Sequence, residues 1–502
     1  MKIRNTWILT TACIAGVSLA QQTEEKSASP AAPILTVKPI AQDEAASAAP
    51  KVDPAQMQSA TGLNAFAVKP DPIGKAAKKG VKWLLEHQLK NGGWGQGDES
   101  QNMGRGMQGF AAKANVGDTC VAAMVLLRTE DAVPGSPLAG PHQEELRQAI
   151  RFVLREIEAS DQDSMWVTSV RGTRIQSKIG QYIDTSLASI LLGEMLGRMG
   201  NDNENARVEN ALAKVTHKLA KNMKADGSWE NRGWAGGIQS AAATKGYFRA
   251  MSNARPGSAV ASEEISQAFE ANVQNWRAQA GQSLSGLGYA DSAGVALYGS
   301  ANQLSSLDEI VRSQKPQAEE WRRELADQSI PEAARRGLEK KVSEFEATVG
   351  QLGRNRSAVL MKLDDEGFVS GFGSNGGEEF WSYWNLSEAL VRDGGNDWLK
   401  WDKSMEKNLG RIQNEDGSWS GHHCITGRTF CTSAALLVLL ADRTPAAAKA
   451  VNAPTAQQPG TAAEPIVPGK TDKPKMVPVV DPAPVIRKAE RVGPIKDGNG
   501  SR

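Results

Sequence analysis

The chain has 502 residues, a formal net charge of +1 and an aromatic content of 6%. A chain of this length exceeds the usual limit of a single hydrophobic core, so we expect several domains or one large repetitive architecture. The balanced charge argues against nucleic acid and against an anionic membrane as partners.

Residues 1–20 have the pattern of a secretory signal peptide. Lys2 and Arg4 precede an apolar stretch at residues 7–19, and small residues lie before the expected cleavage position. The apolar stretch is shorter than the roughly 20 residues that span a bilayer, so we expect no transmembrane anchor. The sequence therefore predicts a secreted or periplasmic protein.

Two flanking segments are poor in large apolar residues. Residues 21–70 consist largely of Ala, Pro, Ser and Gln, and residues 444–502 contain ten of the 23 prolines and no aromatic residue. Such segments bury too little apolar surface to offset the entropy of ordering the chain. We expect a disordered linker and a disordered tail on either side of an ordered region at residues 71–443.

Within the ordered region the hydrophobic pattern is helical, and six pairs of segments can be distinguished. The first member of each pair is amphipathic and charged, at about 73–90, 142–158, 205–224, 262–280, 308–356 and 397–413. The second is richer in Ala, Leu and Gly, at about 116–129, 181–199, 236–252, 289–305, 376–392 and 429–442. Helices of the first kind belong on an outer surface, and helices of the second kind belong where neighbours surround them. The pattern predicts an all-α fold with two concentric rings of helices.

Three of the outer segments end in a similar motif. The fullest copy is Lys79-Gly80, Trp83-Leu84, Gln88 and Gly92-Gly93-Trp94; the shorter copies are Asn222 with Asp226-Gly227-Ser228-Trp229, and Gln413 with Asp416-Gly417-Ser418-Trp419. Gly allows the chain to leave a helix with positive φ, the amide side chain bonds exposed helix-end carbonyls, and Trp covers the junction.

This motif resembles the QW motif of the squalene cyclase and prenyltransferase repeat superfamily. Residues 79–94 match every term of the family pattern, whereas the copies near Trp229 and Trp419 match only its ends. The resemblance covers the helical region and implies an (α/α)6 toroid with a central cavity. In such a toroid the first and sixth inner helices are neighbours.

The fifth outer segment is longer than the others. Residues 329–332 have the pattern of a helix start, with Ser329 as the cap and Pro331 in the first turn. We expect a charged helical hairpin at about 317–350 that projects from the ring. It is interpreted either as a solvated surface or as a surface for a protein partner, and the tail is a second candidate for that role.

The resemblance to cyclases implies an Asp-x-Asp-Asp acid for protonating an alkene or epoxide. The only comparable pair is Asp364-Asp365, and Lys362 stands where the first Asp belongs. We therefore expect no terpene cyclase activity.

Protein prenyltransferase β-subunits, in the same superfamily, hold zinc with an Asp-x-Cys and a distant His. Asp118 and Cys120 have this spacing, and His422 and His423 precede the last inner segment. The resemblance implies a zinc site formed by Asp118, Cys120 and His423 at the seam of the ring, with an open fourth position. Asp118 also has a simpler interpretation, as a helix N-cap.

An oxidising compartment favours one disulfide among the three cysteines that follow the signal peptide. Aligning the Ala-Ala pairs of the first and last inner segments places Cys431 one position from Cys120, which predicts a Cys120–Cys431 disulfide. A Cys424–Cys431 bridge, metal binding and unpaired buried thiols are the alternatives.

The loop before the last inner segment contains His422, His423, Cys424 and Arg428. Either imidazole is a candidate base, metal ligand or hydrogen-bond donor. Cys424 next to His423 permits a thiolate–imidazole pair for acyl transfer.

Other polar groups are expected at the same rim. Arg171, Arg174 and Lys178 precede the second inner segment, where they are candidate ligands for phosphate, sulfate or uronate.

Acidic and aromatic residues open the fifth inner segment. Glu378 and Glu379 are followed by Trp381 and Trp384. Aromatic faces beside carboxylates suit a sugar or an apolar ligand, with packing of the Trp side chains in the core as the alternative.

Together these patterns predict an extracytoplasmic toroid that binds a hydrophobic or glycan-like ligand, or a partner, in its central cavity and at its rim. One alternative is a metal-dependent or Cys/His transferase, hydrolase or lyase at the seam of the ring. The other is a cell-envelope scaffold.

Overall fold

The structure, a computed structural model, describes residues 68–98, 108–130, 138–230, 233, 236–254, 257–279, 293–373 and 376–444. The expected signal peptide, nearly all of the expected linker and the expected tail beyond residue 444 lie outside these ranges. The described residues form α-helices and short 3-10 turns without a β-strand, which confirms the prediction of an all-α fold. None of their helices combines the length and the apolar character needed to cross a membrane.

Twelve of the described helices form two sets. The inner set is α3 (Val116–Thr129), α6 (Ile183–Met195), α8 (Gly236–Asn253), α10 (Ala293–Ala326), α13 (Gly377–Asp393) and α15 (Arg428–Leu439). The outer set is α2 (Lys75–Glu86), α4 (Gln143–Ala159), α7 (Asp202–Lys221), α9 (Glu263–Gln279), α11 (Glu332–Leu363) and α14 (Gly395–Ile412). Two short helices, α5 (Arg174–Lys178) and α12 (Glu366–Ser370), lie in connections.

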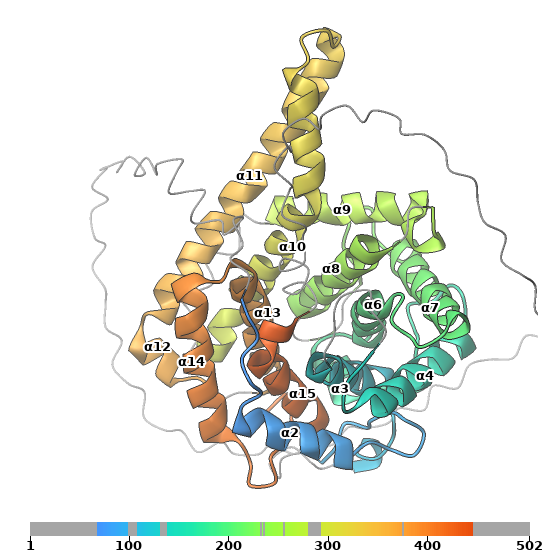
Figure 1. The fold of residues 1–502 in the computed structure, drawn as a ribbon, viewed down its shortest axis with the longest axis vertical. Coiled ribbons are helices and arrows are strands. Elements are labelled where there is room, and N and C mark those ends of the chain that lie inside the picture. The colour runs from blue at the N-terminus through green and yellow to red at the C-terminus, as the bar shows by residue number, and fades with distance from the viewer. Residues whose placement is uncertain are drawn as a thin grey trace, which may run out of the picture. The chain divides into compact units, whose positions relative to one another are not determined.

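The inner helices contact one another in chain order, and α15 also contacts α3, so the series of contacts closes on itself (Figure 1). The outer helices lie around them, and α2 contacts both α14 and α15. The first and last helices of the described region are therefore neighbours.

Burial distinguishes the two sets as the residue patterns require. Every residue of α3 is buried, whereas α2 buries one stripe that includes Ala77, Val81 and Leu84. Inner helices also approach closely: a Cβ at Gly193 of α6 would lie 2.8 Å from the backbone of Arg249 in α8. Small residues in the inner segments thus permit close packing on several sides.

The three copies of the turn motif have the same geometry. In each, the Trp indole Nε1 donates to the carbonyl of a Leu ten residues earlier: Trp94 to Leu84 at 2.8 Å, Trp229 to Leu219 at 2.8 Å and Trp419 to Leu409 at 2.9 Å. Each Trp satisfies a carbonyl near the end of an outer helix while its ring is buried.

A glycine with positive φ precedes each of these Trp residues by two positions, at Gly92, Gly227 and Gly417. A Cβ at Gly417 would lie 2.7 Å from the Lys79 carbonyl oxygen of α2, and a Cβ at Gly92 or Gly227 would lie even closer to a backbone carbonyl oxygen of α4 or α9, at 2.5 and 2.1 Å. Gln413 Nε2 also donates to the Ala76 carbonyl at 2.9 Å. Each turn therefore joins its outer helix to the next one, and the last turn joins α14 to α2.

The ends of the described region also meet. The Asp71 amide donates to Asp442 Oδ2 at 2.8 Å, and Arg443 Nη2 donates to the Asp71 carbonyl at 2.6 Å.

The inner helix α10 and the outer helix α11 that follows it form a hairpin that projects from the other helices (Figure 1). Its first arm is the continuation of the inner helix α10, which passes through Pro316, and α11 is the returning arm. The prediction of Ser329 as the N-cap is wrong. The Ser329 amide and hydroxyl both donate to Asp327, and α11 begins at Glu332 after Pro331.

Candidate metal centre

Three potential metal ligands meet where α13 begins and the loop before α15 passes it. They are Glu378 in the first turn of α13, and His423 and Cys424 in the loop. A carboxylate oxygen, an imidazole nitrogen and the thiol sulfur lie within 4.8 Å of one another. Among the described residues, no other group of three or more His, Cys, Asp and Glu side chains has this geometry.

Glu378 is the buried member of the group, with 1% exposure. Its Oε2 accepts a hydrogen bond from the Ile425 amide at 3.3 Å, whereas Oε1 accepts none from the described residues. Burial raises the pKa of Glu378, and the Ile425 amide, the Cys424 thiol and His423 lower it only in part. A buried carboxylate oxygen without a partner is costly, and a bound cation would remove that cost.

Glycines hold the loop against the start of α13. A Cβ at Gly376 would lie 2.1 Å from the His423 carbonyl oxygen, and one at Gly421 would lie 2.1 Å from that of Ile425. The Gly377 amide donates to the Ile425 carbonyl at 2.8 Å. Close backbone contact on both sides fixes the loop that carries the two ligands.

Cys424 has a φ of 59°, the only positive φ of a non-glycine residue in the described chain. This region disfavours side chains and costs on the order of 1 kcal/mol or more. His423 Nδ1 lies 3.2 Å from the Cys424 sulfur. The unusual backbone conformation thus accompanies the placement of the sulfur beside the imidazole and Glu378.

The Cys424 thiol is not an activated nucleophile by itself. Burial and the neighbouring Glu378 raise its pKa, and Lys178 and Arg174 offset this only in part. Reactive cysteines require a lowered pKa, so the predicted thiolate–imidazole pair lacks its thiolate near neutral pH. A metal ion would displace the thiol proton directly.

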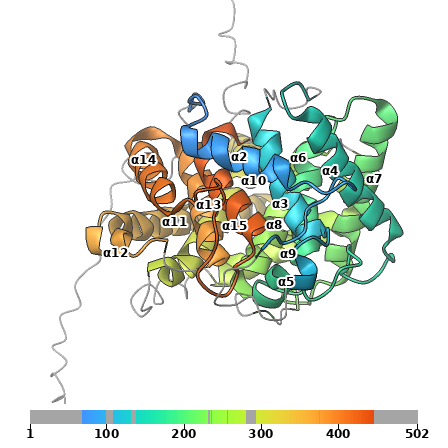
Figure 2. The same ribbon diagram turned by 90° about the horizontal axis from the view of Figure 1, so that it is seen from below.

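The rim residues separate into two kinds. Lys178 and Arg174, on α5, are near enough to influence Cys424, and Figure 2 shows α5 at the end of the helices toward which the loop before α15 extends. Arg171 instead stacks on Trp166, with its guanidinium carbon 3.8 Å from the ring centroid. Arg428 pairs with Asp416.

His422 is exposed and is not part of the three-ligand group. Of the two adjacent imidazoles, the structure therefore assigns only that of His423 to the candidate site.

The predicted zinc set of Asp118, Cys120 and His423 is wrong. Asp118 and Cys120 are fully buried in α3, and both interact with Asp184 of α6. Asn115, not Asp118, caps α3, and its Nδ2 donates to Asp118 Oδ2 at 2.7 Å. Within the described part of the chain, these two side chains form no ligand group with His423.

The predicted Cys120–Cys431 disulfide is also wrong, since none of the three described cysteines is in a disulfide. Thr119 Oγ1 accepts from the Trp94 amide and Thr432 Oγ1 from the Trp419 amide, both at 2.9 Å. Thr119 thus corresponds to Thr432, and the alignment of the Ala-Ala pairs is shifted by one residue. One residue turns a helical side chain by about 100°, which separates the two sulfurs.

Glu379, Trp381 and Trp384 lie in the core and not at the rim, each with 0% exposure. Glu379 accepts hydrogen bonds from the Tyr383 hydroxyl and, at 2.9 Å, from the Gly373 amide. The two indoles donate to α10 and α13, where they fill the space between inner helices. Of the predicted acidic and aromatic group, only Glu378 reaches the candidate site.

A second buried group of charged side chains, the ionic cluster, lies between the inner helices and shares no residue with the candidate metal centre. Arg128 of α3 bonds Glu388 of α13 at 3.0 Å, and Lys245 of α8 bonds the same carboxylate at 2.8 Å. Neither α3 nor α8 is adjacent to α13 in the series of inner helices, so these side chains meet in the middle. The cluster is completed by Glu194, Arg249, Asp308, Glu309 and Arg392. It occupies part of the space where the resemblance implies a cavity.

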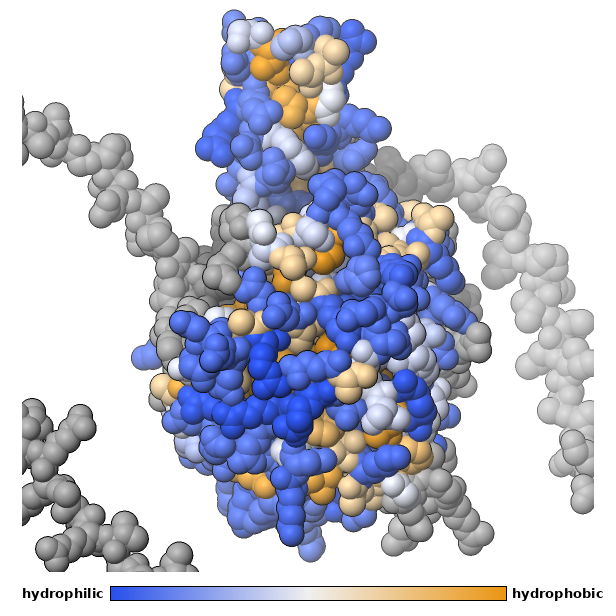
Figure 3. Space-filling view, turned by 90° about the vertical axis from the view of Figure 1, so that its right-hand side faces the viewer, coloured by the Kyte–Doolittle hydropathy of each residue, from blue (hydrophilic) through white to orange (hydrophobic). Residues whose placement is uncertain are grey.

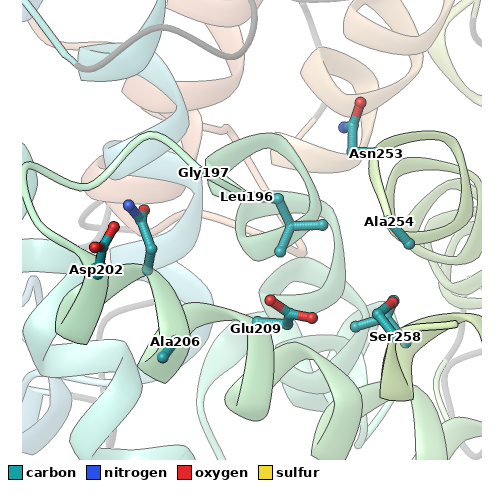
Figure 4. Close-up of a pocket in the computed structure, with 10 residues that line it drawn as sticks. Leu196, Gly197, Asp202, Ala206, Glu209, Asn253, Ala254 and Ser258 are labelled. Carbon is teal, nitrogen blue, oxygen red and sulfur yellow. The ribbon is translucent and has the colours of Figure 1, made fainter. Parts of the chain in front are cut away.

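A separate cavity of about 420 Å³ lies between the end of α6, the start of α7 and the segment after α8 (Figure 4). Asp202 and Glu209 of α7 line it together with Leu196 and Ser258. It contains none of the site residues predicted from the sequence.

No protein-family model matches the chain, and a search of curated proteins finds no match. The functional assignment therefore depends on the geometry of the chain itself.

Proposed function

We propose that the chain is an extracytoplasmic (α/α)6 toroid of the squalene cyclase and prenyltransferase type that holds a divalent transition-metal ion, preferentially zinc. The alternation of inner and outer helices, the three matching turns and the closed series of inner contacts support the toroid. The residue pattern of positions 1–20 supports secretion.

The observation that carries the metal proposal is the meeting of Glu378, His423 and Cys424 within 4.8 Å, with Glu378 Oε1 buried and lacking a partner. A carboxylate, an imidazole and a thiolate are the three ligand types that zinc takes in proteins. The mixed set excludes calcium and magnesium as preferred ions, because both favour oxygen ligands.

Three protein ligands leave a fourth position for water or a substrate. Bound zinc supplies a Lewis acid and lowers the pKa of bound water. The chain contributes a loop fixed by close glycine contacts, an exposed His423 that keeps the site accessible, and the α5 cations, which favour a substrate with a negative charge. We infer a metal-dependent hydrolase, transferase or lyase rather than a terpene cyclase.

The proposal is tested by metal content and affinity of the purified full chain. We expect one zinc ion per chain after dialysis, and in the cobalt-substituted protein a thiolate-to-metal charge-transfer band that Cys424→Ser removes. His423→Ala should weaken zinc binding by more than the roughly 10–100-fold typical of residues that only support a ligand.

His422→Ala is the matched control, since it removes the adjacent exposed imidazole, and it should leave the affinity unchanged. Absence of stoichiometric metal from the wild-type chain, or equal losses in the two His variants, would contradict the proposal.

A further inference from the structure

A groove lies between α9 and the base of the hairpin formed by α10 and α11. Its volume is about 730 Å³, within the range of roughly 300–1,000 Å³ that small-ligand sites have. None of the residues that line it belongs to the metal centre. Figure 3 shows that the projecting hairpin is mostly covered by hydrophilic residues, with hydrophobic ones near its tip.

The inner end of the groove contains a guanidinium held in place. Arg277 Nε donates to Thr348 Oγ1 at 2.9 Å, and Nη2 donates to Gln314 Oε1 at 2.8 Å. Glu344 lies 3.6 Å from Nη1, and the Arg277 side chain is 15% exposed. The cation is therefore oriented before any ligand binds, which reduces the entropy that binding must overcome.

The outer end contains an aromatic ring and open space. Trp321 of α10 is half-buried, and the ammonium of Lys341 lies 5.5 Å from its ring centroid. Gly337 of α11 has no side chain, and a Cβ there would meet nothing within 4 Å. An indole beside an unfilled region is a surface on which a flat apolar face can stack.

Charges of both signs line the groove. Arg277, Lys340 and Lys341 are cationic and Glu270 and Glu344 are anionic, which leaves one net positive charge. The two carboxylates would repel a polyanion such as an acidic peptide, but they accept hydrogen bonds from hydroxyl groups. A fitting ligand therefore has many hydroxyls, an apolar face and few negative charges.

We propose that this groove binds an oligosaccharide that carries a single uronic acid unit. One pyranose ring stacks on Trp321, its hydroxyls bond the carboxylates and amides of the lining, and its carboxylate pairs with Arg277 or Lys341. The site is separate from the metal centre and does not depend on it.

Calorimetric titration of the full chain with xylotriose bearing one glucuronate, unsubstituted xylotriose and a hexapeptide of glutamates tests the proposal. We expect saturable binding of the glucuronate-bearing xylotriose, at least several-fold weaker binding of the neutral xylotriose, and none of the peptide. Removal of zinc by a chelator should leave these results unchanged.

Two variants locate the site, and a third is the control. Trp321→Ala should abolish binding of the glucuronate-bearing xylotriose, and the exposed Lys341→Gln should reduce the preference for the acidic sugar without disturbing the hairpin. Arg336→Gln, on the same helix but paired with Glu332 outside the groove, should bind as the wild type does. The proposal is overturned if no saccharide binds saturably, if the peptide binds as tightly, or if both groove variants retain wild-type affinity and preference.

Discussion

Glu378 and Glu388 lie ten residues apart on α13, and each is 1% exposed, yet their surroundings are opposite. Glu388 accepts hydrogen bonds from Arg128, Lys245 and Trp384, whereas Glu378 accepts one from a backbone amide and leaves Oε1 without a partner.

The pKa values of the two carboxyl groups differ accordingly. Burial alone would raise the pKa of Glu388, but Lys245, Arg249 and Arg128 hold it well below its ordinary value. Burial raises the pKa of Glu378, and the Ile425 amide, the Cys424 thiol and His423 offset this only in part. The two carboxylates are equally buried, but their neighbours differ. Glu388, surrounded by cations, stabilises the fold, whereas Glu378 is available to a ligand.

The largest expected effect comes from neutralising each carboxylate in turn. Glu388→Gln leaves Arg128, Lys245 and Arg249 buried with too little negative charge, and it should lower the free energy of unfolding by about 3–5 kcal/mol. Glu378→Gln removes a poorly compensated charge and should change it by less than about 1 kcal/mol. Urea denaturation of the metal-free chain measures both, and equal losses would remove the distinction between the two sites.

The second effect concerns Asp118, which, like Glu378, has a buried carboxylate oxygen without a hydrogen-bond partner. Burial, with a smaller contribution from Asp184, raises the pKa of Asp118 from 3.8 to about 7, although Asn115 lowers it. Because the folded chain holds this proton more tightly than the unfolded chain, stability should fall as the pH rises from about 4 to about 7.

Asp118→Asn should remove this dependence, on the order of 1–4 kcal/mol, from the unfolding free energy measured across that range. Asp364→Asn, at a carboxylate 71% exposed, is the control and should leave the slope unchanged. A wild-type stability that rises between these pH values, with no change in Asp118→Asn, would contradict the assignment.

The third effect compares two glycines of the α14 region. Gly417 has a φ of 93° and presses on the Lys79 carbonyl, so Gly417→Ala should cost about 1–3 kcal/mol. Gly410 lies inside α14, and a Cβ there meets nothing within 4 Å, so Gly410→Ala should stabilise by about 0.5–1 kcal/mol. Thermal unfolding should shift in opposite directions, and equal shifts would refute the proposed role of the turn in joining α14 to α2.

The smallest effect is a difference in thiol reactivity. Cys424 is half-buried, whereas Cys120 and Cys431 are fully buried, so of these three described cysteines a thiol reagent should modify only Cys424 in the native chain. Zinc should protect Cys424, while all three react after unfolding. Rapid native modification of Cys120, or reactivity of Cys424 that zinc does not change, would conflict with this description.

The residue pattern predicts the helices well where the distribution of polar and apolar residues alone determines whether a helix is inner or outer. The polar stripe of α2 and the apolar run at residues 120–127 of α3 define outer and inner positions without knowledge of any contact. The turns were predictable for the same reason, because Gly417 and Trp419 act within one local segment.

The site was less predictable because it depends on register and on contacts across the fold. The one-residue shift between Thr119 and Thr432 was sufficient to suggest a disulfide that does not form. Glu378 and His423 were both identified as rim residues. Nothing in the sequence indicates that His423 lies beside Glu378 rather than beside Asp118.

The ionic cluster was missed altogether. Its signal is the presence of single charged residues, such as Arg128, Lys245 and Glu388, within otherwise small and apolar inner segments. Such residues are identified as partners only once nonadjacent helices are known to face one another.

The contact between Asp71 and Asp442 has a consequence for the order in which the chain is connected. Since residues 371 positions apart touch, a short peptide linker would join them directly. New chain ends placed in the tip of the hairpin, at residues 327–331, would interrupt no inner helix contact. A circular permutant of this design is expected to fold with the same inner and outer sets of helices. The reason is that the inner helices form a closed series of contacts and the two ends of the described region lie together.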